Sequence, residues 1–96
     1  MKAVFIIFSA PLELLVLGAL KNLQVKFYTK LPYLLGEGGE SEPHLDTQIW
    51  PGFNMGLFVV TDEKTKDRIL NEVKSIKASY LKEGIKAYVI PVSEEV

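Results

Sequence analysis

The stretch KAVFIIFSAP at residues 2–11 decides the fold, because it joins a short buried strand to the start of a helix. Residues 4–8 are all β-branched or aromatic, a composition typical of a buried strand. Ser9 is an expected N-cap, and Pro11 is tolerated in a first helical turn. The chain therefore begins with a predicted strand at residues 2–8 that leads directly into a helix.

Two helices and three further strands are predicted along the chain. The Leu-rich segment 12–23 has helical spacing and is apolar on nearly all sides, which is typical of a helix covered on more than one face. The predicted elements after residue 8 are a helix at 12–23, strands at 25–31 and 53–61, a helix that Asp62 caps and Gly84 ends, and a strand at 85–92.

The order β-α-β-β-α-β over residues 1–96 predicts a single domain of the α+β class. Right-handed crossovers fold this order into a ferredoxin-like βαββαβ sandwich, in which a four-stranded antiparallel sheet carries both helices on one face. The other face of the sheet then has no cover. Because 48% of the residues are apolar, we expect further copies of the chain to cover that face.

The composition excludes several classes of function. The chain has no cysteine, so thiol nucleophiles, disulfides and iron–sulfur clusters are excluded, and the absence fits a cytoplasmic protein. Interspersed charges with a net charge of -1 do not favour nucleic-acid binding, and no apolar stretch is long enough for direct membrane insertion. Residues 1–8 could pass for a signal peptide, but Ser9, Pro11 and Glu13 interrupt the apolar run. A single histidine and no nucleophile–base pair indicate a protein that is not an enzyme.

A long loop at residues 33–52 holds the candidate site residues. His44, Asp46 and Glu42 could bind a divalent metal, or they could be ordinary polar residues of a solvated loop. Gly36, Gly38 and Gly39 could admit an anion to the backbone, or they could only make the loop flexible. Trp50 could line a ligand site or anchor the loop, and Asn54 could bind a ligand or close a turn; these alternatives stay open.

Among proteins with the βαββαβ order, several families lack their defining residues here. A metallochaperone needs a Cys-x-x-Cys motif, and an acylphosphatase-like enzyme needs an arginine after the first strand, where this chain has Ser9, Ala10 and Pro11. An RNA-recognition motif needs a basic residue with the aromatic residues of its third strand, and residues 52–59 have none.

Three loop motifs resemble an uncharacterised branch of the PII-like family of trimeric signalling proteins. They are Gly36-Glu37-Gly38, Glu42-Pro43 and the run Trp50-Pro51-Gly52-Phe53-Asn54. The branch often has a histidine two residues before the tryptophan, where this chain has Gln48. The PII proteins of nitrogen regulation hold ATP phosphates with basic residues, whereas no Lys or Arg lies between Leu31 and Phe53.

The resemblance implies a homotrimer with ligand sites at the clefts between subunits. The ligand would be a small molecule, an adenine nucleotide or a divalent metal, and its binding would switch residues 33–51 to control a transporter or a regulatory target protein. The ligand-binding residues implied are Gly36, Glu37, Gly38, Gln48, Trp50 and Asn54. The alternative is a divalent-metal protein similar to CutA, with His44, Asp46 and Glu42 as the ligands.

Overall fold

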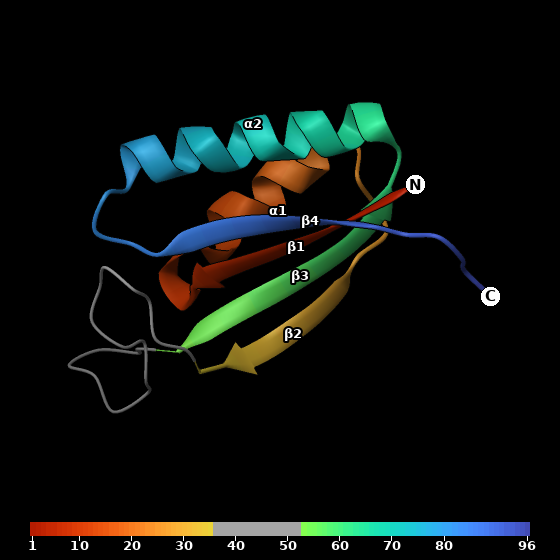
Figure 1. Ribbon diagram of the computed structural model, residues 1–96. Coiled ribbons are helices and arrows are strands. Elements are labelled where there is room, and N and C mark those ends of the chain that lie inside the picture. Colours follow the sequence, from red (N-terminus) through yellow and green to blue (C-terminus); the bar gives the residue numbers. More distant parts are fainter. Residues whose placement is uncertain (36–52) are drawn as a thin grey trace.

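The first strand, β1 (Lys2–Ser9), lies inside the sheet, where it pairs with β3 on one edge and with β4 on the other. A computed structural model gives the structure and describes residues 1–35 and 53–96 (Figure 1). The remaining elements are the 3₁₀ helix η1 (Ala10–Leu12), α1 (Glu13–Asn22), β2 (Thr29–Leu34), β3 (Asn54–Thr61), α2 (Glu63–Ser79) and β4 (Ile85–Pro91).

The strands form one antiparallel sheet in the order β2-β3-β1-β4. Both helices lie on the same side of this sheet, as Figure 1 shows. The predicted ferredoxin-like βαββαβ fold is therefore confirmed. Among the described residues, no helix is both long and apolar enough to cross a membrane.

The hydrophobic core lies between the sheet and the helices. Alternate residues of the two central strands face it in matched pairs, Val4 with Val59, Ile6 with Leu57 and Phe8 with Met55. The helices and β4 contribute the other buried members, which are Leu12, Val16, Leu20, Ile69, Val73, Ile76 and Ile85. Because side chains alternate along a strand, this pairing directs the intervening residues to the opposite face, which we call the outer face.

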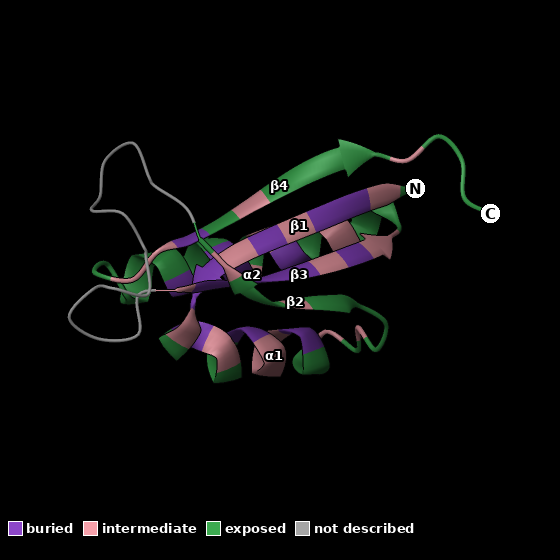
Figure 2. Cartoon of the chain, turned by 90° about the horizontal axis from the view of Figure 1, so that it is seen from below, coloured by how far each residue is buried: buried purple, intermediate pink, exposed green. Residues whose placement is uncertain are grey.

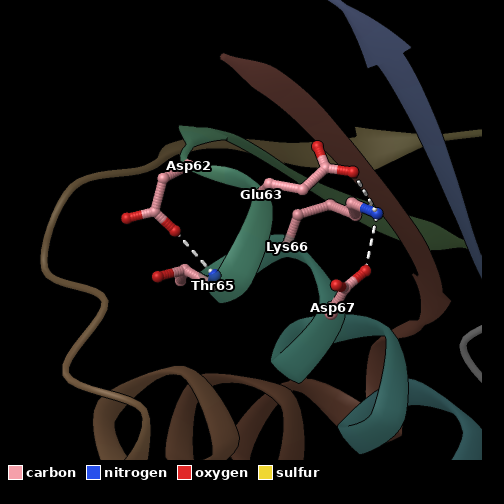
Figure 3. Close-up of polar contacts among 5 residues, drawn as sticks. All are labelled: Asp62, Glu63, Thr65, Lys66 and Asp67. Carbon is pink, nitrogen blue, oxygen red and sulfur yellow. Dashed lines mark hydrogen bonds and ion pairs between the residues drawn. The ribbon is translucent and has the colours of Figure 1, made fainter.

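The helix α2 begins as the sequence predicts. The carboxylate of Asp62 accepts a hydrogen bond from the backbone N–H of Thr65 at 2.7 Å, the contact expected of an N-cap. This backbone hydrogen bond, with a smaller contribution from the Thr65 side chain, lowers the pKa of Asp62. The amino group of Lys66 lies between two carboxylates of the same turn, 2.6 Å from Asp67 and 3.2 Å from Glu63 (Figure 3), and their hydrogen bonds raise the pKa of Lys66.

The helix end predicted at Gly84 is wrong, and the N-cap predicted at Ser9 is confirmed in position only. Ser9 is the N-cap of the 3₁₀ helix η1, which has Pro11 in its turn and leads directly into α1, but the Ser9 side chain makes no capping hydrogen bond. Leu12 is the N-cap of α1 itself. The helix α2 ends at Ser79, with Tyr80 as its C-cap, so Gly84 lies beyond the helix in the turn that leads to β4. Ser9 and Gly84 hydrogen-bond to each other instead.

The second strand lies later in the sequence than residues 25–31, because α1 ends in a backbone turn that uses the residues after it. Gln24 has a φ of 62°, and the N–H of Val25 donates to the carbonyl oxygen of Leu20 at 2.9 Å. This is a Schellman motif with glutamine where glycine is usual. β2 therefore starts at Thr29 and continues to Leu34, so residues 33 and 34 belong to the strand and not to the expected loop.

Candidate functional site

Three segments of the chain converge at one end of the sheet, the end where the chain leaves β2 and returns to β3. The backbone N–H of Ser9, at the end of β1, donates to the carbonyl oxygen of Gly84 at 2.8 Å, and the Gly84 N–H donates to the Ser9 Oγ at 3.0 Å. The N–H of Ala10 donates to the carbonyl oxygen of Phe53 at 3.2 Å. These bonds hold together the end of β1 and the starts of β3 and β4. The end of β2 pairs with the start of β3, and we call the region that these four strand ends form the loop-bearing end.

An aromatic pair connects the end of β2 with the residue before β3, the two places where the chain enters and leaves residues 36–52. The rings of Tyr33 and Phe53 are stacked, with centroids 5.1 Å apart and planes 24° apart. One residue farther along each strand, Leu34 is paired with Asn54. The spacing between the two attachment points is therefore fixed by packing and by strand pairing.

Asn54 is the one predicted ligand-binding residue that the structure describes. It is the first residue of β3, it is buried, and it lies opposite Ser9 on one side and Leu34 on the other. This position places Asn54 inside the loop-bearing end.

The other predicted site residues lie outside the described residues. They are the ligand-binding candidates Gly36, Glu37, Gly38, Gln48 and Trp50, and the metal-binding candidates His44, Asp46 and Glu42. Within residues 1–35 and 53–96, no group of three His, Cys, Asp or Glu side chains is arranged to hold a metal ion.

Lys86 is a candidate that the loop motifs did not indicate. It is the second residue of β4, it is exposed, and its register partner on β1 is Ile7. Since Ile85 is buried in the core, alternation directs Lys86 to the outer face, close to the turn at residues 80–84. The signal that could have found it is the alternation along β4, which sets one positive charge among apolar side chains.

The outer face beside the loop-bearing end is largely apolar. Phe5 and Phe58 lie opposite each other on it, with ring centroids 6.1 Å apart in an edge-to-face arrangement. Tyr88 and Ile90 of β4 are 50% and 47% exposed there. Figure 2 views the molecule from the side away from α2 and shows β4 exposed along most of its length. A monomeric protein rarely leaves so continuous an apolar surface open to water.

Comparison with solved structures gives matches over nearly the whole chain. A proposed PII-like signalling protein from Thermus thermophilus matches with a TM-score of 0.65 and 26% sequence identity, over 93% of this chain and 83% of that chain. CPII, a nitrogen regulatory PII-like protein from Thiomonas intermedia, matches in a complex with ADP, AMP and bicarbonate, with a TM-score of 0.73 and 16% identity, over 97% of this chain and 88% of that chain. The apo form of CPII matches with a TM-score of 0.65 and 16% identity, over 95% of this chain and 89% of that chain.

These likenesses show that the chain has a PII-like fold. No protein-family model matches the sequence, and no curated protein matches it. The fold evidence is therefore structural, and it agrees with the resemblance that the loop motifs carry.

Proposed function

We propose that this chain is a PII-like regulatory protein that binds a small ligand where its copies meet and uses residues 33–51 to control a partner protein. The observation that carries the proposal is the position of the loop-bearing end, which borders an apolar face that no described part of the chain covers. A second copy that packs on this face would complete a cleft beside Asn54 and Lys86. The ligand site and the subunit interface would then be continuous.

The assembly we propose is a homotrimer joined through the outer faces. Phe5, Phe58 and Tyr88 lie side by side across three strands of this face, so one contact buries three aromatic side chains. Aromatic residues of this kind dominate the energetics of protein interfaces. Three copies related by a rotation axis each offer the same face, which agrees with the trimer that the PII-like resemblance implies.

The ligand we propose is an adenine nucleotide. CPII shares this fold and has been solved with ADP and AMP, which supports nucleotide binding in this chain. The amine of Lys86 would pair with phosphate oxygens at the mouth of the site, and Asn54 would donate or accept a hydrogen bond deeper in it. Binding of the nucleotide would then change the conformation of residues 33–51, and that change would reach the partner protein.

The role we propose is binding without catalysis. The described residues contain neither histidine nor cysteine, so a nucleophile with an adjacent imidazole base is absent from residues 1–35 and 53–96. Ser9 is engaged with Gly84 by two hydrogen bonds, which favours a structural role for its hydroxyl group.

Calorimetric titration with ADP tests the nucleotide site. The native chain should bind ADP, and the variant Lys86→Ala should bind it about tenfold more weakly, because a charge-assisted hydrogen bond to phosphate is lost. Lys77→Ala is the matched control, since Lys77 is an exposed lysine in the last turn of α2, on the helix side of the sheet. Equal ADP affinity in the Lys86→Ala and Lys77→Ala proteins would contradict the role of Lys86.

Limited proteolysis with and without ADP tests the switch. Cleavage within residues 36–52 should change when ADP is present, and an unchanged cleavage pattern would contradict the proposed switch.

Titration with Zn²⁺ or Cu²⁺ distinguishes the CutA-like alternative. Quenching of Trp50 fluorescence that is lost in His44→Ala, together with no response to ADP, would favour metal binding over the nucleotide site.

A further inference from the structure

Gly56 occupies a point on the outer face where a side chain has no room. A Cβ atom at this position would lie 2.8 Å from Cε1 of Phe5 and 2.9 Å from Cδ1 of Leu34. It would also lie 3.4 Å from Cδ1 of Leu31. Carbon atoms in good contact are about 3.5–4.0 Å apart, so the first two side chains have to move if Gly56 gains a Cβ. The glycine thus leaves a hollow in the sheet that the side chains of its neighbours fill.

The hollow connects the outer face with the loop-bearing end. Phe5 lies over it and packs edge-to-face against Phe58 on the outer face. Leu34 enters it from β2, beyond the register shift that separates Leu31 from Leu34, and Leu34 pairs with Asn54. The backbone of Leu34 follows that of Tyr33, whose ring is stacked on Phe53. The position of the end of β2 therefore depends on how the Leu34 side chain is seated over Gly56.

We propose that Gly56 is a positioning residue for the loop-bearing end: its bare backbone seats Leu34, and the seated Leu34 fixes the end of β2 and the residues from which the 36–52 segment departs. The inference rests on the proposed function only in taking ADP as the ligand of that end. Gly56 touches no ligand in this arrangement. Gly56 affects the end of β2 because it leaves room for the Leu34 side chain. It affects the outer face because it leaves room for the Phe5 ring.

The chain supplies a matched control for the test. Gly18 lies in α1, and a Cβ atom built there meets nothing within 4 Å. Gly56→Ala and Gly18→Ala therefore add the same methyl group at a filled and at an open position. Hydrogen–deuterium exchange without ligand should rise several-fold at residues 29–35 in the Gly56→Ala protein and stay unchanged there in the Gly18→Ala protein. Unchanged exchange at residues 29–35 in the Gly56→Ala protein would overturn the inference, whatever the ligand is.

ADP affinity is the second measurement, and it separates positioning from general stability. The Gly56→Ala protein should bind ADP about tenfold more weakly than the native chain, because displacement of the site by a fraction of an ångström is costly, whereas Gly18→Ala should leave the affinity unchanged. If the native chain binds ADP and Gly56→Ala binds it equally well, positioning by Gly56 is overturned and the proposed function stands. If the native chain binds no ADP, the nucleotide proposal fails, and the exchange experiment alone decides the role of Gly56.

Leu34→Ala keeps the test decisive if Gly56→Ala does not fold. This variant removes the seated side chain and leaves the hollow, and it should raise exchange at residues 29–35 in the same way. Where both variants fold, the double variant should lose less affinity than the sum of the two single losses, because the new Cβ no longer meets Leu34. Additive losses, or native exchange in the Leu34→Ala protein, would overturn the inference.

Discussion

Among the described residues, Gln24 is the one non-glycine residue with a positive φ, which is 62° at the end of α1. A side chain with a Cβ atom is disfavoured in the left-handed region, and glycine is not. Gln24→Gly should therefore raise the free energy of unfolding by about 0.5–1 kcal/mol, measured by chemical denaturation.

Gln24→Ala is the control, because alanine removes the amide group but keeps the Cβ atom. It should leave the free energy of unfolding nearly unchanged. A gain in the alanine variant equal to that in the glycine variant would show that the side-chain amide, and not the backbone conformation, is unfavourable at this position.

Residue-level features could be predicted from the sequence where the contact is local. The N-cap at Asp62 is predictable because its partner, Thr65, is three residues away. Ser9 stands at the N-cap position of η1, but its side chain does not cap that helix, because the partner of its hydroxyl group is Gly84, 75 residues along the chain. Gln24 gives no sequence signal, since a left-handed residue at a helix end is usually glycine. Of the proposed site residues, Asn54 is indicated by its loop motif, whereas Lys86 is indicated only by the alternation of side chains along β4.

At the scale of elements, the start of α2 depends on one ionised carboxylate. The pKa of Asp62 is lower in the folded protein than in the unfolded chain, so its contribution to stability is present above its ordinary pKa and is lost as the pH falls through the lowered value. Asp62→Asn keeps a capping side chain that does not titrate. Between neutral pH and about pH 3, the melting temperature of the native chain should therefore fall more than that of the Asp62→Asn protein.

Thermal unfolding followed by circular dichroism at a series of pH values measures this difference, and the other carboxylates cancel because both proteins share them. Parallel curves for the two proteins would show that the Asp62 charge does not stabilise α2. Asp62→Ala, which removes the cap altogether, should have a lower melting temperature than both at neutral pH.

The interior of α1 offers a stabilising substitution. Gly18 lies within this helix, and its Cβ position is open. Gly18→Ala should raise the free energy of unfolding by about 0.5–1 kcal/mol, since alanine loses less backbone entropy on forming a helix. The same change at Gly56 should lower it, because the added methyl group meets Phe5 and Leu34. Chemical denaturation of both variants measures whether each substitution raises or lowers the free energy of unfolding. A lower free energy of unfolding in Gly18→Ala would mean that a methyl group at position 18 does meet neighbouring atoms.

The boundary of β2 shows why elements are harder to place than to identify. Alternation of apolar and polar residues correctly predicts a strand near residue 30. The pattern does not show that the strand starts only at Thr29, because it contains no sign of the backbone turn that ends α1 at Gln24 and Val25. The pairing of β2 with β3, which includes a register shift between Leu31 and Leu34, sets the true end of the strand. The βαββαβ order is predictable because it needs only the number and type of the elements.

At the scale of the whole molecule, the apolar outer face predicts how the protein associates. Tyr88 is 50% exposed there and lies opposite Phe5, so a charge at this position should not unfold the isolated chain but should oppose burial of the face in an assembly. Tyr88→Lys should weaken association by about tenfold or more, as expected when a central aromatic residue of an interface is replaced.

Leu14→Lys is the control, because Leu14 is 84% exposed on α1, on the other side of the sheet. Sedimentation velocity over a range of concentrations should show the native chain and the Leu14→Lys protein as trimers and the Tyr88→Lys protein shifted toward the monomer. If Leu14→Lys dissociates the assembly and Tyr88→Lys does not, the copies meet through their helices, and the proposal that a second copy completes the cleft beside Asn54 and Lys86 is wrong.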